Sequence, residues 1–253
     1  MLRYLKRFLF SKGITVSRNR SKTNSSPVEL DASDLEIINY VRAANLSMGS
    51  YDNLYTTALA CKHVIEMEIE GDFVECGVYR GGHSIIAAEI FNRYGVEKKV
   101  YLFDTFKGMT EPTSNDFSLG SGLPARIKYN NRKYKDHVDW AYCSLIEVKK
   151  NFIDAKLMHN NIIFVEGDVL QTIPSKVNSP ASISFLRLDT DWYESTKIEL
   201  EFFYPILSKN GILVVDDYGS WAGSRKATEE YFTNKHKPFL SLIEGGARVG
   251  IKI

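Results

Sequence analysis

The sequence Leu186-Arg187-Leu188-Asp189-Thr190-Asp191 is an apolar run that ends abruptly in carboxylates. A second run, Val214-Val215-Asp216-Asp217, ends in the same way. Such runs are typical of buried parallel strands, which present functional side chains at the carboxyl edge of an open α/β sheet. Four acids at neighbouring strand ends would repel one another unless a cation lay between them, and a hard divalent ion prefers oxygen ligands. The two runs therefore predict a metal site at one edge of a sheet.

The rest of the chain alternates between strand and helix patterns. Strands are expected over residues 72–76, 99–103, 162–165, 183–188 and 212–215, with a helix over 83–94. Two helices precede them, one beginning with the capping-box form Ser33-Asp34-Leu35-Glu36 and one over 51–66. Two β-type runs flank residues 244–247 and suggest a closing hairpin. This order predicts βαβ units in a doubly wound, mostly parallel sheet with an antiparallel C-terminal edge strand.

The length of 253 residues suits one α/β domain with additions. We expect a basic tail and linker over residues 1–32 and one folded domain over 33–253. Within that domain, residues 107–140 are polar and longer than an ordinary connection. Because they follow the second expected strand, they would be able to fold over the strand ends as a lid.

The net charge of +1 hides an uneven distribution. Residues 1–25 carry seven Lys or Arg and no acid, which leaves 25 basic and 31 acidic side chains in the remainder. A body of that sign does not suit a nucleic-acid partner. Residues 1–10 have a basic amphipathic pattern that suits weak association with an anionic membrane surface, but a plain disordered tail fits better, because one or two helical turns bury little area.

Two further observations bear on location. No apolar run is long enough to span a bilayer, and the N-terminus lacks the apolar core and cleavage site of a signal peptide. The three cysteines, Cys61, Cys76 and Cys143, have no metal-type spacing, and an odd count favours a reducing compartment. We therefore expect a cytoplasmic protein, whose tail would act at the inner face of the membrane.

A glycine-containing turn follows the first expected strand, in Phe73-Val74-Glu75-Cys76-Gly77-Val78-Tyr79-Arg80-Gly81-Gly82. Glycines here allow a tight turn and a close approach of a ligand to the backbone. An acid at Glu75 suits a cationic ligand better than a pyrophosphate, and so favours S-adenosylmethionine (SAM) over NAD. Taken alone, the pattern fits a purely structural strand–helix turn about as well.

Acids also end the next two strands. Asp104 is placed to accept hydrogen bonds from ribose hydroxyls, and Asp168 could meet an adenine amino group. Each one alone is explained as a helix cap or a turn residue. Three successive strands that end in an acid at the same sheet edge favour a cofactor site.

Asp189, Asp216 and Asp217 are expected to converge from adjacent strands as metal ligands, although one or two of them could instead cap the helices that follow. Ligands that are all oxygen point to Mg²⁺, with Ca²⁺ or Mn²⁺ able to substitute.

Together these motifs resemble the macrocin O-methyltransferase family, over roughly residues 45–235 in consistent order. The segment Met48-Gly49-Ser50 is included. The matching segments are residues 71–82, 101–109, 187–196 and 215–219. The resemblance implies a class I methyltransferase fold, Rossmann-like, with a seven-stranded sheet. It also implies methylation of a sugar hydroxyl with SAM and a divalent cation, as in macrolide and aminocoumarin biosynthesis.

The resemblance implies roles for individual residues. Metal ligation is implied for Asp189, Asp216 and Asp217. Cofactor contacts are implied for Ser50, Glu75, Gly77, Val78, Tyr79, Gly81, Ser84, Asp104, Thr105 and Asp168. For the base that removes the hydroxyl proton, Asp191 is the first choice and Asp189 the second.

The lid follows no family pattern, so the acceptor stays open. We expect a small-molecule or glycan acceptor, which includes a glycoside, a natural product or a surface glycan, and a homo-oligomeric enzyme. One alternative is methyl transfer to a catechol or another vicinal diol. Another is a non-catalytic partner subunit that binds SAM or a nucleotide.

Overall fold

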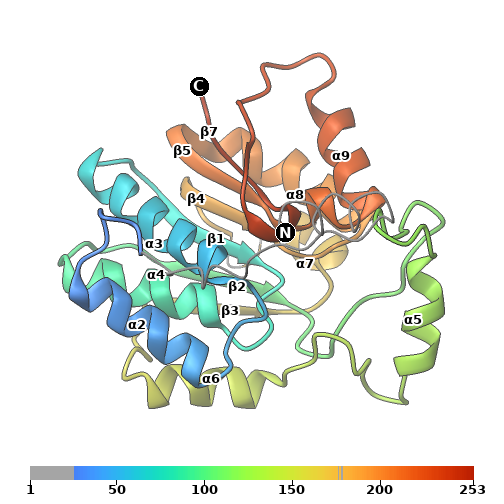
Figure 1. The fold of residues 1–253 in the computed structure, drawn as a ribbon, viewed down its shortest axis with the longest axis horizontal. Helices are drawn as coiled ribbons and strands as arrows, with labels where there is room; N and C mark the ends of the chain where they lie inside the picture. Colours follow the sequence, from blue (N-terminus) through green and yellow to red (C-terminus); the bar gives the residue numbers. More distant parts are fainter. Residues whose placement is uncertain (1–25, 176, 178) are drawn as a thin grey trace, which may run out of the picture.

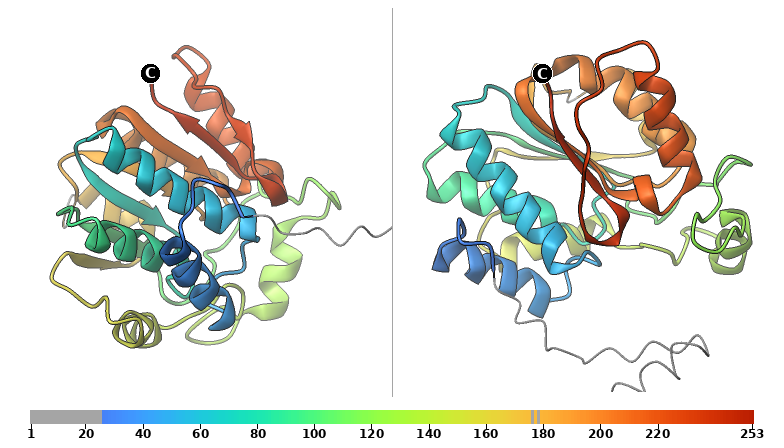
Figure 2. Two further views of the ribbon diagram at one scale, coloured as in Figure 1. Left: turned by 60° about the vertical axis from the view of Figure 1, so that its left-hand side comes forward. Right: turned by 45° about the horizontal axis from the view of Figure 1, so that its top comes forward.

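The computed structural model describes residues 26–175, 177 and 179–253. These residues form three layers, with one sheet between two sets of helices (Figures 1 and 2). The N-terminal segment over residues 1–10, for which a membrane-binding helix was considered, lies outside the described residues.

The sheet has seven strands in the order β3-β2-β1-β4-β5-β7-β6. The first five strands are mutually parallel, β7 runs antiparallel to β5, and β6 runs antiparallel to β7. The expected mostly parallel sheet with a closing hairpin is therefore confirmed, with the short β6 at the outer edge. The strands are β1 (Asp72–Cys76), β2 (Val100–Asp104), β3 (Ile162–Glu166), β4 (Ile183–Leu188), β5 (Leu207–Val215), β6 (Ser241–Leu242) and β7 (Arg248–Ile251).

Side chains alternate between the two faces of the sheet, because successive residues of a strand point in opposite directions. Phe73 and Phe185 join the core under one set of helices, and Val74 and Leu186 join the core under the other. The first face is covered by α2 (Ala32–Ala43), α3 (Tyr51–Glu66), α4 (Gly82–Arg93) and α6 (Leu145–Asp154). The second face is covered by α7 (Val169–Ser175), α8 (Tyr193–Ile206) and α9 (Ala222–Phe232).

The register of the parallel strands brings their carboxyl ends together. Cys76 pairs with Leu188 on one side and with Phe103 on the other, and Leu188 pairs with Val215. The residues that follow these strands therefore meet at one edge of the sheet, which positions the glycine turn beside the acids.

The first helix begins two residues earlier than expected. The capping box of α2 is formed by Asp31 and Asp34, whose side chains each accept a hydrogen bond from the other's backbone N–H, and not by Ser33 and Glu36. Asp34 is fully buried, and its charge is balanced there by ion pairs with Lys62 and Arg93. These pairs attach α2 to α3 and α4.

The segment expected to form a lid contains the helix α5 (Ala125–Arg132), which lies beside the sheet and not on either face (Figure 1). The two ends of the lid segment lie side by side and are joined by hydrogen bonds: Val138 N–H donates to Lys107 O, and Met109 N–H donates to Trp140 O. Among the described residues, no helix is both long enough and apolar enough to cross a bilayer.

Candidate active site

A cavity of about 520 Å³ lies at the carboxyl edge of the sheet, between the strand ends, the start of α3, the base of the lid and the loop between β6 and β7. Most of the residues singled out from the sequence line it. They are Ser50, Glu75, Gly77, Val78, Tyr79, Asp104, Thr105, Asp189, Asp191, Asp216 and Asp217. One cavity therefore holds both the glycine turn and the paired acids.

The remaining three residues lie outside the lining. Gly81, with a φ of +88°, is the N-cap of α4. Ser84 is fully buried and donates its hydroxyl to the Glu75 carboxylate. Asp168 accepts a hydrogen bond from Leu170 N–H at 2.9 Å, which is the geometry of a cap for α7, while its neighbours Gly167 and Val169 line the cavity.

The turn after β1 is tight because it passes very close to the end of β4. Gly77 has a φ of +82°, and a Cβ there would lie 1.9 Å from the carbonyl oxygen of Asp189. The Asp104 carboxylate shapes this turn by accepting hydrogen bonds from Val78 N–H at 2.6 Å and Tyr79 N–H at 3.3 Å. Its other oxygen accepts from Phe106 N–H at 2.7 Å. Asp104 therefore holds two loops of the cavity together.

Glu75 is almost completely buried, with 1% of its surface exposed. Ser84 donates to one of its oxygens, and Arg187 Nη1 lies 3.2 Å from the other. Burial raises the pKa of Glu75 to about 7, although Arg187 and Ser84 act in the opposite direction. A cationic ligand in the cavity would stabilise the charged form of this carboxylate.

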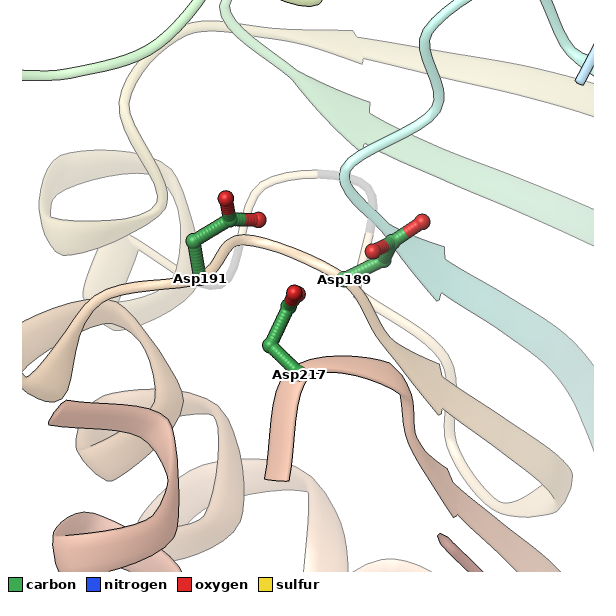
Figure 3. Close-up of side chains that lie close together, drawn as sticks. All are labelled: Asp189, Asp191 and Asp217. Atoms are coloured by element: carbon green, nitrogen blue, oxygen red, sulfur yellow. The ribbon is translucent and has the colours of Figure 1, made fainter. Parts of the chain in front are cut away.

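Three carboxylates converge on the other side of the cavity. Asp189, Asp191 and Asp217 each place an oxygen within 4.8 Å of the others; the first two come from the loop after β4 and the third from just after the end of β5 (Figure 3). Asp191 has a φ of +67°, an uncommon backbone conformation for a residue other than glycine.

Burial, reinforced by the neighbouring carboxylates, disfavours the charged forms of the acidic cluster. Burial raises the pKa of Asp189 and of Asp217 well above the ordinary value, and neighbouring carboxylates add to the effect. Burial and the charge of Asp189 raise the pKa of Asp191 to about 8. The Oδ2 atom of Asp217 is buried and has no hydrogen-bond partner among the described residues.

Asp216 is directed elsewhere. It accepts a hydrogen bond from Arg187 Nη2 at 2.7 Å and lies 3.3 Å from Asn53 Nδ2. Arg187 also lies 2.6 Å from Asp189 and 3.2 Å from Glu75, so one buried guanidinium connects three acids of the site. Sequence analysis did not assign Arg187 a role. The signal was present, because a charged residue inside an apolar strand needs buried partners.

His83 also lines the cavity, although it was not among the predicted site residues. Its Nδ1 lies 2.7 Å from Thr57 Oγ1 and its Nε2 lies 3.2 Å from Ser47 Oγ. Burial lowers the pKa of His83 well below its ordinary value. Because Thr57 Oγ1 donates to Asn53 O, we assign the proton to Nδ1, which leaves Nε2 to accept from Ser47.

The opposite wall of the cavity comes from the lid and the C-terminal hairpin. Met109, Thr110 and Trp140 line it from the lid, and Glu244 and Gly245 line it from the loop between β6 and β7. This wall is formed by segments that are far apart in the sequence, so no local motif could predict it.

Comparison with known proteins agrees with this geometry. Residues 14–241 match the model of the Macrocin-O-methyltransferase (TylF) family. Mycinamicin III 3''-O-methyltransferase of Micromonospora griseorubida is 30% identical over 203 residues, which is 76% of this chain and 76% of that protein. Demethyldecarbamoylnovobiocin O-methyltransferase of Streptomyces niveus is 31% identical over 169 residues, which is 66% of this chain and 60% of that protein.

A solved structure supports the same relationship. The O-methyltransferase NovP superimposes with a TM-score of 0.71 at 26% identity, over 82% of each chain. The family match covers most of the chain and includes the carboxyl ends of the five parallel strands, which line the cavity. The chain therefore belongs to the macrocin O-methyltransferase family and is an O-methyltransferase.

Proposed function

We propose that this enzyme transfers a methyl group from SAM to a sugar hydroxyl of a glycoside, natural product or surface glycan, with the help of a divalent cation. The observation that carries the proposal is the division of one cavity into two halves. One half contains the glycine turn with Glu75 and Asp104, and the other contains the cluster of Asp189, Asp191 and Asp217. The curated relatives, which act on mycinamicin III and on demethyldecarbamoylnovobiocin, support an acceptor of the glycoside class.

The donor half suits SAM because of its charge. SAM supplies an electrophilic methyl group on a sulfonium, and it carries an ammonium group as well. Glu75 is buried, and its only cationic partner among the described residues is Arg187, which is shared with two other acids. Gly77 lines the cavity, and its lack of a side chain lets the turn after β1 pass against the Asp189 backbone.

The acidic cluster fits a divalent cation. The carboxylates of Asp189, Asp191 and Asp217 lie within reach of one ion, and the buried Oδ2 of Asp217 lacks a partner among the described residues. Oxygen donors of this kind suit Mg²⁺, with Ca²⁺ or Mn²⁺ able to substitute. We propose Asp189 and Asp217 as ligands and retain Asp216 as the third, although its carboxylate is bonded to Arg187 and Asn53. A bound cation would polarise the acceptor hydroxyl and lower its pKa.

Asp191 is the proposed general base. It lies in the same cluster as the proposed ligands and lines the cavity. A carboxylate there would accept the proton of the hydroxyl as the oxygen attacks the methyl carbon, while the bond from that carbon to sulfur breaks and S-adenosylhomocysteine leaves. Thr110 and Trp140 would enclose the acceptor and exclude water, since both line the cavity from the lid. Holding the oxygen in line with the methyl group supplies a large part of the acceleration in such transfers.

The test begins with calorimetry. We expect binding of SAM and S-adenosylhomocysteine, and no binding of NAD. We expect Asp189→Asn to retain SAM affinity and to lower turnover of a sugar acceptor by at least about 100-fold. Glu194→Gln is the matched control, because Glu194 is an exposed acid in the first turn of α8.

Two results would contradict the proposal. Full activity of the wild-type enzyme in EDTA would exclude a role for a divalent cation. Turnover of catechols in preference to sugars, in a panel of acceptors, would replace the substrate class.

We also propose a cytoplasmic location and a homo-oligomeric assembly. The three cysteines are buried and free, which suits a reducing compartment. Size-exclusion chromatography with light scattering would measure the subunit number.

A further inference from the structure

We propose that Asp116, in the lid, is a positioning residue that ties the lid to the loop carrying Asp189 and Asp191. Asp116 is a charged residue with 1% of its surface exposed, in a segment whose sequence is mostly polar. It does not line the cavity. The part of the proposal that concerns catalysis depends on the methyl transfer proposed above.

Each oxygen of the Asp116 carboxylate has a separate task. Oδ1 accepts a hydrogen bond from Tyr193 N–H at 2.8 Å, outside the lid. Oδ2 accepts from Thr113 N–H at 2.7 Å and from the Thr113 hydroxyl at 2.9 Å, inside the lid. The backbone carbonyl of Asp116 accepts from Ala125 N–H, the first residue of α5. One side chain therefore organises the lid and bonds to the body of the enzyme.

The body needs this bond. The N-cap of α8 is Trp192, which makes no side-chain hydrogen bond to the helix. The first N–H groups of a helix have no partner within it, and a carboxylate placed there satisfies a donor and interacts well with the helix dipole. Asp116 supplies this carboxylate from a segment 77 residues away.

The start of α9 also packs closely against the Asp116 carboxylate. A Cβ on Gly223, in the first turn of α9, would lie 1.9 Å from Asp116 Oδ1 and 2.7 Å from Tyr193 N. A side chain at position 223 would therefore occupy the position of the Asp116 carboxylate. Gly223 has ordinary helical geometry, so this close approach, and not backbone conformation, accounts for a glycine here.

Two further contacts join the lid to the same loop. Trp192 Nε1 donates to Thr110 O at 3.0 Å, and the Trp192 ring packs edge-on against Trp140 at 5.4 Å between centroids. On the other side of Asp191, Thr190 Oγ1 donates to Glu199 Oε1 at 2.8 Å. Both sequence neighbours of Asp191 are therefore held in place. Movement of the lid would therefore disturb the residues on both sides of the acidic cluster.

The consequence is that closure of the lid and placement of Asp191 are coupled. With Asp116 seated, α8 begins at Tyr193 and the preceding loop is held from both sides. Without Asp116, the lid loses its only carboxylate bond to α8 among the described residues, and Tyr193 N–H loses its partner. The acceptor would then meet a wider cavity and a less fixed base.

The experiment compares three variants. Asp116→Ala removes all three hydrogen bonds, and Asp116→Asn keeps the shape while replacing one acceptor oxygen with a donor. Asp136→Ala is the matched control, because Asp136 is a lid aspartate with 85% of its side chain exposed, and among the described residues its carboxylate bonds to His137 alone. Hydrogen exchange, SAM affinity by calorimetry and steady-state kinetics are measured for each.

For Asp116→Ala we expect amide exchange over residues 109–140 and 189–193 to accelerate by about tenfold or more, since a bond to a charged group is lost. We expect SAM affinity to stay within about threefold, and kcat/KM for the acceptor to fall by about tenfold or more through both kcat and KM. Asp116→Asn should show smaller changes in the same direction, and Asp136→Ala should match the wild type.

A residue that only stabilises the fold would lower the melting temperature and leave exchange at 189–193 and the kinetic constants of the folded enzyme unchanged, and that result would overturn the proposal. If Asp116→Ala does not fold, Asp116→Asn provides the same comparison. Hydrogen exchange is measured without turnover. If the proposed reaction is wrong, the wild type will be inactive, yet Asp116→Ala will still accelerate exchange in both the lid and residues 189–193.

Discussion

Glu199 shows how much a single residue of this site depends on its surroundings. It lies on α8 directly behind the acidic loop, fully buried, and one oxygen accepts the Thr190 hydroxyl. The other oxygen has no partner among the described residues. Burial raises the pKa of Glu199 to about 8, so its carboxyl group is largely protonated at neutral pH in the folded enzyme.

This shift predicts a pH dependence of stability. The unfolded chain releases the Glu199 proton near the ordinary pKa of 4.5, whereas the folded chain keeps it up to about 8, so stability falls as pH rises through that window. By pH 7 the loss is about 3 kcal/mol. Glu199→Gln has no proton to lose, so its free energy of unfolding should exceed that of the wild type by an amount that grows from about pH 5 to about pH 8. Urea titrations check this, with Glu201→Gln, exposed on the same helix, as the control; parallel curves for Glu199→Gln and the wild type would refute it.

The roles of Asp191 and Asp216 can be separated by substitution. We expect Asp216→Asn to weaken Mg²⁺ binding by about tenfold or more, because a ligand is lost. We expect Asp191→Asn to keep Mg²⁺ affinity and to lower kcat by about 100-fold or more, because the base is lost. Calorimetry with Mg²⁺ in the presence of SAM, together with turnover, checks both. Loss of Mg²⁺ binding in Asp191→Asn would instead make Asp191 a ligand, as its position in the cluster also allows.

Individual site residues were predictable where chemistry and strand position coincide. Asp189 and Asp217 end apolar runs, and a charge at such a place has few structural uses. Arg187, His83 and Asp116 were not assigned to the site, because their meaning depends on partners brought near by folding. Arg187 and Glu75 are 112 residues apart in the sequence and meet only through the register of β1 and β4.

At the scale of elements, strands were predicted more sharply than the pieces between them. The bounds of β1 and β4 were predicted as the structure has them, since both are short, mostly apolar segments bounded by polar residues or glycine. β5 begins at Leu207 and not at Ile212. Its first half was not predicted, because residues 208–210 are polar. The helix α5 was missed for a similar reason, as Ala125 and Tyr129 are its only buried residues.

The turn between β1 and α4 yields a prediction about an element. Gly77→Ala would place a methyl group against the Asp189 carbonyl and require a positive φ, so we expect a loss of at least about 2 kcal/mol of stability. SAM affinity should fall as well, since β1 and β4 must move apart at the cavity. Gly95→Ala is the control, because Gly95 has a φ of +65° with no atom near its missing Cβ and should cost only about 1 kcal/mol. Equal losses in urea titrations of the two variants would show that backbone strain alone is responsible.

At the scale of the whole molecule, the uneven charge has a consequence that can be tested. The folded body carries more acids than bases, while residues 1–25 carry seven cations and no acid. An anionic membrane would therefore attract the N-terminal segment and repel the body, so any association should depend on that segment and on low salt.

We expect the full chain to sediment with vesicles that contain phosphatidylglycerol and to be released at an ionic strength of about 1 M, where charges are screened beyond ~3 Å. Deleting residues 1–25 should abolish sedimentation while leaving the melting temperature and SAM affinity unchanged, because the cavity is built entirely from residues 42–245. Replacing Arg3, Lys6 and Arg7 with glutamine separates charge from length, and should weaken binding by about 1 kcal/mol for each cation removed. Equal sedimentation of the full and shortened chains would assign membrane association to the body or exclude it, and the tail would then have to be explained by something other than its charge.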